Sequence, residues 1–375
     1  MKVSRTSFIA VQAGLPTIFI GDFGIGKTST LYAFASFLGI EVVRLPLLGA
    51  VPEDIVGYPY KYDIVVDGKT ISLTGHATYD KIYRLSQGNC LLLLDEIGRI
   101  DQDRLQNVVA TILDRKVGQF SIPDNVLIAG TCNTYDIGGQ YDINYNVLTR
   151  CLWYKCSIDD LEEDMALVSG EYNHNWVKLP NDWRKYIPSA ALFLLGFKKT
   201  NRTAFKRPDS DLVSETFVCP RTITYAKLAL AANFSVGYKT VSDIVDICSA
   251  SCGSAFGAAI GSYCKSLTLP DTELFINEFL LHELEYEFKV NPVGNLMALF
   301  TEVTNYINLI ADKDLPTARQ IWNMSVKYID RYIIDDYPEI ALFIAHTLLK
   351  CNEAVRGLLP AKLIKLMRDV KSSGG

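Results

Sequence analysis

The chain has 375 residues, of which 49% are hydrophobic and 21% charged, and its net charge is −5. This composition excludes a largely disordered protein, allows two or three domains, and weakly disfavours non-specific nucleic-acid binding, which depends on neutralising phosphates. We find no apolar run of membrane-spanning length, no N-terminal signal segment, and no C-x-x-C pair among the nine cysteines. We therefore expect a cytoplasmic protein with reduced thiols and without a zinc site.

The first stretch with a chemical signature is 21–28, which fits the phosphate-binding pattern G-x-x-x-x-G-K-[ST]. A short helix is expected at 4–13, a buried strand at 17–20 just before the pattern, and a helix at 29–38 just after it. In such a loop, backbone N–H groups and a helix N-terminus converge on phosphates. The alternative is a glycine-rich turn that precedes a lysine by chance.

Within this loop, Lys27 would reach the β- and γ-phosphates of a nucleotide, and Thr28 would hold Mg²⁺. The residues predicted to bind the nucleotide are Gly21, Asp22, Phe23, Gly24, Ile25, Gly26, Lys27, Thr28 and Ser29.

The next part of the chain predicts a strand at 41–45 and then an inserted hairpin. Two alternating runs, 61–66 and 70–73, are joined by Asp67-Gly68, which is a strong hairpin signal. A helix is predicted at 78–87.

An unbroken apolar run follows at 90–94, which is typical of a strand covered on both faces. Asp95 and Glu96 end it, at the position where open α/β sheets bind ligands. Asp95 would act on Mg²⁺, and Glu96 would polarise the attacking water. The alternative is that the two acids only begin the following helix, because acids favour helix N-termini.

The remaining elements of this part are an amphipathic helix at 101–113, a strand at 125–133, a loop at 136–146 and a fifth strand at 151–158. Asn133 ends the strand at 125–133, where it would either orient the attacking water or serve as an ordinary turn residue. This alternation predicts an α/β three-layer domain with a parallel sheet that ends near residue 160.

Beyond residue 160 the pattern is mostly helical. We expect an acidic helix at 159–170 and a fraying tail at 371–375. Further helices are predicted at 187–197, 220–233, 241–248, 252–265, 271–288, 293–311, 315–333 and 338–349.

Together, these motifs resemble a MoxR-type AAA+ ATPase of the branch that carries a hairpin insert in helix 2. The stretch 51–57 is similar to the L-P-x-D-I-x-G that precedes the insert, and 95–99 is similar to D-E-I-N-R. The stretch 131–134 is similar to T-x-N-P, and 148–150 to L-x-R-F. The departures from the family pattern are Phe23 for Pro, Gly98 for Asn, and Thr149 and Cys151 for Asp and Phe.

The resemblance implies an AAA+ core over 1–160 with a hairpin insert near 58–75. It also implies an all-α lid at 161–266, followed by a C-terminal helical extension at 267–375.

It also implies catalytic roles beyond the motifs above. Asn133 would be sensor 1, and Arg150 would be the finger inserted into the neighbouring subunit's site. Arg221 would be sensor 2, contacting the γ-phosphate in its own subunit. The alternative for Arg150 is a surface ion pair, and Arg99 and Arg115 are the next candidates for the finger.

The activity implied is hydrolysis of Mg-ATP by a ring, commonly a hexamer, that remodels protein partners in a chaperone-like manner, often with a von Willebrand A-domain protein. A second hypothesis is a nucleic-acid motor or a GTP-using restriction subunit. A third is a scaffold that binds ATP with negligible turnover, which the presence of Lys27 and Glu96 disfavours. The sequence contains no determinant of adenine over guanine.

Overall fold

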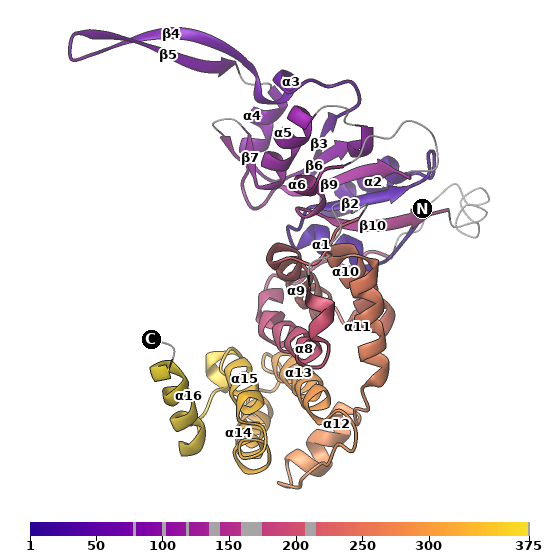
Figure 1. Cartoon of the computed structure of the whole chain (residues 1–375), viewed down its shortest axis with the longest axis vertical. Coiled ribbons are helices and arrows are strands. Elements are labelled where there is room, and N and C mark those ends of the chain that lie inside the picture. Colours follow the sequence, from indigo (N-terminus) through magenta and orange to yellow (C-terminus); the bar gives the residue numbers. More distant parts are fainter. Residues whose placement is uncertain are drawn as a thin grey trace. The chain divides into compact units, whose positions relative to one another are not determined.

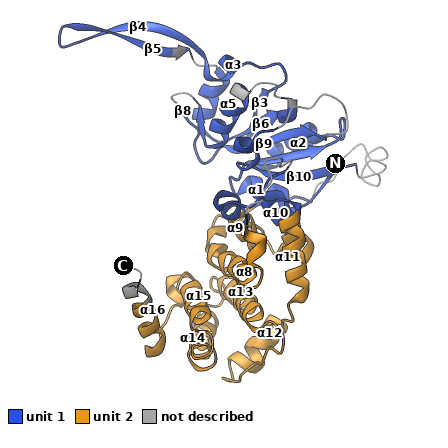
Figure 2. Ribbon diagram, viewed as in Figure 1, with its two compact units in different colours: residues 1–178, 207–226, 246–254 blue, residues 179–206, 227–245, 255–375 orange. Residues whose placement is uncertain are grey.

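The computed structural model describes residues 1–77, 80–99, 103–117, 120–134, 143–158, 175–206 and 215–373. The chain divides into two compact units, coloured separately in Figure 2. Unit 1 comprises Met1–Lys178, Arg207–Ala226 and Asp246–Ser254, and unit 2 comprises Leu179–Lys206, Lys227–Val245 and Ala255–Gly375. The domain boundaries at residues 160 and 266 remain a prediction.

Unit 1 is built on a six-stranded sheet of order β1-β10-β2-β9-β6-β3. Five of the strands are parallel, and the short β1 joins the edge antiparallel to β10. The strands are β1 (Lys2–Val3), β2 (Thr17–Gly21), β3 (Glu41–Pro46), β6 (Cys90–Asp95), β9 (Leu127–Asn133) and β10 (Leu152–Ser157). Because the five are parallel, their carboxyl ends share one edge of the sheet.

Both faces of this sheet are buried, as the apolar run at 90–94 predicts. Leu91 and Leu93 pack with Phe34 in one core cluster, whereas Leu92 and Leu94 pack with Val109 in another. The helices of unit 1 include α1 (Thr6–Gln12), α2 (Lys27–Leu38), α4 (Asp80–Ser86) and α5 (Asp103–Leu113). Helices therefore cover the sheet from two sides (Figure 1), which confirms the three-layer α/β fold.

The inserted hairpin forms a separate two-stranded sheet of β4 (Tyr58–Val66) and β5 (Lys69–Ala77). It extends outward from the rest of unit 1 in Figure 1. The turn lies at the predicted Asp67-Gly68, whose φ angles are 51° and 74°. Both strands are longer than their alternating runs suggest.

Short elements of unit 1 escaped prediction because they have too few residues to show a period. They are α3 (Glu53–Val56), a 3-10 turn (Ile97–Arg99), the paired strands β7 (Lys116–Val117) and β8 (Phe120–Ser121), and α6 (Tyr145–Leu148). Asn144 caps α6, so the predicted loop at 136–146 ends earlier than expected. The rest of that loop, and the helix predicted at 159–170, lie largely or wholly outside the described residues.

The rest of the chain is helical, as predicted. The longer helices are α8 (Ile187–Thr200), α9 (Pro220–Ser235), α10 (Val241–Cys252), α11 (Ser254–Ser266), α13 (Pro292–Ile310), α14 (Leu315–Tyr332), α15 (Pro338–Leu348) and α16 (Ala361–Ser373). The core of unit 2 contains an apolar cluster that includes the fully buried Trp322 and Phe300. Among the described residues, no helix has the length and apolar character needed to cross a membrane.

One expectation for the C-terminal half is wrong. The helix predicted at 271–288 is α12 (Thr272–Leu274) and a π-helical turn (Phe275–Leu280), after which Tyr286 packs its ring against Phe275 and Phe279 instead of continuing the helix. The tail expected to fray at 371–375 is assigned to α16 through Ser373, and Gly374 and Gly375 lie outside the described residues, so that expectation stays a prediction. Its helix is held by the fully buried Leu363, which belongs to the core of unit 2.

Candidate functional site

The loop between β2 and α2 brings its backbone to the N-terminus of a 12-residue helix. Gly26 caps that helix with a φ angle of 82°, which side chains with a Cβ atom rarely adopt. At Gly21, a Cβ atom would lie 2.6 Å from the carbonyl oxygen of Cys156. Of the other predicted loop residues, Ile25 is buried, whereas Asp22, Phe23, Gly24 and Ser29 are exposed. This geometry suits a backbone cradle for an anion.

Lys27 lies at the bottom of this loop and is only 7% exposed. Its Nζ donates to the carbonyl oxygens of Gly21 at 2.8 Å and Asp22 at 2.6 Å, and to Oδ1 of Asn133 at 3.0 Å. Asn133 pairs with Gly21 in the sheet register, so the ends of β2 and β9 meet here. Burial lowers the pKa of Lys27 below its ordinary value.

Asp95 is the last residue of β6. Its Oδ1 accepts hydrogen bonds from Thr131 Oγ1 at 2.6 Å and Thr28 Oγ1 at 3.1 Å. Its Oδ2 accepts from Nε of Arg44 at 2.8 Å, and the Arg44 Nη2 lies 2.5 Å away. Burial alone would raise the pKa of Asp95, but the hydrogen bonds from Thr131 and Arg44 outweigh it and lower that pKa.

Thr28 and Asp95 fit the metal predicted here, because a hydroxyl and a carboxylate are the hard oxygen ligands that Mg²⁺ prefers. Their oxygen atoms lie 3.1 Å apart. A magnesium ion held by both would neutralise negative charge on the phosphates of a bound nucleotide.

Glu96 follows with a φ angle of 61°, in the left-handed region that few non-glycine residues adopt. Its backbone N–H donates to Thr131 Oγ1 at 3.0 Å. Thr131 thus holds both the Asp95 carboxylate and the Glu96 backbone, which fixes the two acids relative to each other. Strained backbone of this kind is concentrated at functional sites.

Arg150 and Arg221 lie elsewhere in unit 1, beside Asp114. Arg150 donates its Nε to Asp114 Oδ2 at 2.8 Å and its Nη1 to the Asn146 carbonyl oxygen at 2.7 Å. The Nη2 of Arg221 lies 4.0 Å from Asp114 Oδ1. Arg150 precedes β10, whose first residue, Leu152, pairs with Thr17 at the start of β2. Both arginines are therefore near the amino edge of the sheet, opposite to the edge that holds Lys27.

Arg115, one of the alternative finger residues, is hydrogen-bonded within its own chain. Its guanidinium donates to the carbonyl oxygens of Pro123 at 2.8 Å, Val126 at 3.0 Å and Gly14 at 3.1 Å. The side chain of Arg99, the other alternative, lies outside the described residues.

The structure adds three residues that the sequence did not indicate as part of the site: Arg44, Thr131 and Asp114. Thr131 stands in the stretch that is similar to T-x-N-P, although no role was predicted for it. Arg44 and Asp114 stand in no recognisable pattern with their partners, since Arg44 and Asp95 are 51 residues apart and Arg150 and Asp114 are 36 apart.

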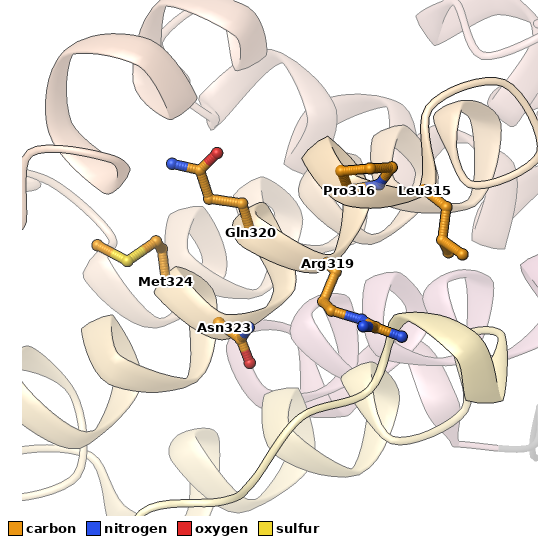
Figure 3. Close-up of a pocket in the computed structure, with 6 residues that line it drawn as sticks. All are labelled: Leu315, Pro316, Arg319, Gln320, Asn323 and Met324. Atoms are coloured by element: carbon orange, nitrogen blue, oxygen red, sulfur yellow. The ribbon is translucent and has the colours of Figure 1, made fainter.

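A cavity of about 530 Å³ in unit 2, drawn in Figure 3, is lined by residues of α14. Its charged residue, Arg319, donates from Nε and Nη2 to the Ala354 carbonyl oxygen at 3.1 and 2.6 Å. That guanidinium thus ties α14 to the segment after α15, and none of the six lining residues belongs to the predicted site.

Comparison with known proteins gives one family match. Residues 17–141 match the family described as ATPase family associated with various cellular activities (AAA). No match is found among curated proteins. Among solved structures, the chain is similar to a candidate ATPase from Cytophaga hutchinsonii ATCC 33406, with 14% identity, a TM-score of 0.40, and coverage of 66% of this chain and 79% of that one. On the family match, the chain contains an ATPase domain of the AAA family over residues 17–141.

Proposed function

We propose that the chain is a MoxR-like AAA+ ATPase that hydrolyses Mg-ATP within a ring and uses the energy to remodel protein partners. The observation that carries the proposal is the separation of the predicted catalytic groups between two edges of one sheet. Lys27, Asp95 and Asn133 meet at the carboxyl edge. Arg150 and Arg221 lie beside Asp114 near the amino edge.

The separation is too large for one subunit to complete the site. β2 connects the two edges with five residues, or roughly 16 Å at the usual rise per residue, which is more than an arginine side chain spans. A second copy that presents its amino edge to this carboxyl edge would supply the missing positive charge. Repeating that head-to-tail contact closes a ring, and we propose a hexamer.

The groups then divide the work of phosphoryl transfer. Lys27 binds the β- and γ-phosphates, Thr28 and Asp95 hold the magnesium ion, and Glu96 and Asn133 position the attacking water. Arg150 from the neighbour neutralises charge that develops in the transition state. The resemblance predicts that Arg221 acts in its own subunit, whereas its place beside Arg150 favours action at the same neighbouring site.

The hairpin is the proposed contact with a remodelled partner. Tyr58, Tyr60, Tyr62, Ile64 and Val66 alternate along β4, so they share one face of the ribbon, and each is at least 36% exposed. The Tyr60 and Tyr62 rings lie 5.7 Å apart. An apolar face without cover on a projecting ribbon is a surface for binding another chain. We propose a protein partner, with a von Willebrand A-domain protein as the first to test.

The proposal is tested by mixing two inactive variants, Arg150→Ala and Lys27→Ala. Each alone should lose nearly all ATPase activity, because one lacks the finger and the other the phosphate-binding lysine. In mixed rings, some interfaces combine an intact loop with an intact finger, so activity should exceed the sum of the two parents. The proposal fails if mixed assemblies form, as shown by differently tagged subunits, and remain inactive. Mixing Arg221→Ala with Lys27→Ala tests Arg221 in the same way.

A further inference from the structure

The carboxylate of Asp95 has no remaining acceptor position. An ionised carboxylate offers about four lone-pair sites on its two oxygens. Thr131 and Thr28 donate to Oδ1 at 2.6 and 3.1 Å. Two nitrogens of Arg44 lie 2.8 and 2.5 Å from Oδ2. The Asp95 side chain is 5% exposed, so these protein groups replace its water shell.

Arg44 is the only charged group among these three partners of Asp95. It belongs to β3, which pairs with β6 so that Arg44 lies opposite Leu93 and Pro46 opposite Asp95. Its backbone carbonyl accepts from Lys81 Nζ at 3.0 Å, which fastens this part of β3 to α4. Its guanidinium approaches the carboxylate with two nitrogens, Nε and Nη2, that share the single oxygen Oδ2, and the pair is charge-assisted.

We propose that Arg44 competes with Mg²⁺ for Asp95, so that the metal is admitted only together with the phosphates of the nucleotide. This inference rests on the proposed role of Asp95 as a metal ligand. Mg²⁺ needs a carboxylate oxygen at about 2.1 Å in a nearly ideal octahedron, and at Oδ2 the two nitrogens of Arg44 already fill that position. A metal on Oδ2 and the arginine therefore exclude each other.

The free energy of binding at Asp95 differs between a free metal ion and a metal ion that is already bound to a nucleotide. A free ion must displace Arg44 and gains only one carboxylate and one hydroxyl from the residues predicted to bind it. An ion already on a nucleotide brings phosphate oxygens as further ligands, and those phosphates also offer the displaced guanidinium an anionic partner. Because the Arg44 side chain is 50% exposed, it can leave the carboxylate without disturbing the core.

The experiment measures binding of Mn²⁺, as a spectroscopic substitute for Mg²⁺, to nucleotide-free protein by electron paramagnetic resonance. Arg44→Met should bind Mn²⁺ about tenfold more tightly than the parent, since one charge-assisted pair no longer competes. Arg44→Lys should stay near the parent because it retains the cation. Arg84→Met is the matched control, because Arg84 makes a similar pair with Glu41, at 2.8 and 2.7 Å, on the same unit.

A second readout is ADP affinity by calorimetry with and without Mg²⁺. The gain in affinity from Mg²⁺ should be larger in Arg44→Met than in the parent. If thermal unfolding shows that Arg44→Met does not fold, Arg44→Gln replaces it, because it keeps a donor but not the charge.

Equal Mn²⁺ affinity in the parent and in the Arg44 variant would overturn the inference, provided that Asp95→Ala abolishes the effect of Mg²⁺ on ADP binding. If Asp95→Ala leaves that effect intact, the assignment of the metal to Asp95 is itself wrong, and this inference falls with it. The two failures are therefore distinguishable.

Discussion

Asp114 is predicted to orient Arg150. The structure allows us to work out how much the placement of Arg150 should suffer when the charge of Asp114 is removed. In the parent, Arg150 Nε lies 2.8 Å from Asp114 Oδ2. Asp114→Asn keeps an oxygen acceptor at this position but removes the negative charge. The side chains of Arg150 and Asp114 are 17% and 40% exposed, so the lost attraction is worth only about 1 kcal/mol. That corresponds to a roughly fivefold smaller equilibrium ratio of correctly placed to misplaced Arg150. The second bond of Arg150, to the Asn146 carbonyl, remains.

Steady-state ATPase assays at protein concentrations that saturate assembly should therefore show turnover about fivefold lower in Asp114→Asn, with an unchanged KM for ATP. Arg150→Ala should lose far more, because arginine fingers are worth roughly 10³–10⁵ in related phosphoryl transfers. Asp124→Asn is the control, since Asp124 is fully exposed and lies 3.8 Å from Arg115 on the same side of the unit. Parental turnover in Asp114→Asn together with an inactive Arg150→Ala would refute the orienting role.

Further predictions concern the loop, the acid and the hairpin. Lys27→Ala should lose nucleotide affinity because the cation facing the phosphates is gone, whereas Glu96→Gln should bind nucleotide normally and lose turnover. Equilibrium binding and single-turnover assays separate the two, and parental hydrolysis by Glu96→Gln would contradict the role of Glu96. Because burial lowers the pKa of Lys27 while bound phosphate favours its charged form, nucleotide affinity should fall as pH rises through that lowered pKa, and calorimetry should detect proton uptake. Replacing 60–74 with a short Gly-Ser linker should leave basal ATPase activity largely intact and impair partner remodelling. Loss of folding in that variant would show instead that the ribbon supports its own unit.

The sequence was most informative where a local pattern determines geometry. The apolar run at 90–94 predicts a strand buried on both faces, and its leucines do alternate between two core clusters. The glycine pattern predicts a tight loop, which the φ angle of Gly26 and the close approach at Gly21 require. Asp67-Gly68 predicts the hairpin turn for the same reason.

Local patterns of this kind do not predict contacts between segments that are far apart in the sequence. The pairing of Arg150 with Asp114 depends on where α5 ends relative to the start of β10, and no period in the sequence reports that relation. The position of Arg221 beside the same acid arises from a chain separation of more than a hundred residues. The ion pair of Arg44 with Asp95 needs the register between β3 and β6, which sequence alone leaves open.

Three of the charged groups proposed for catalysis are each matched by a partner within the chain. Lys27 is held by two carbonyls and Asn133, Asp95 by Arg44, and Arg150 by Asp114. A buried charge without such partners would cost several kcal/mol, so the fold must supply them. In the proposed mechanism, phosphate replaces the internal partners of Lys27 and the metal replaces Arg44 on Asp95, whereas Asp114 keeps Arg150 oriented toward the neighbouring subunit. Nucleotide binding is then an exchange of one set of charge pairs for another at Lys27 and Asp95, and only an assembled ring adds Arg150 to the site.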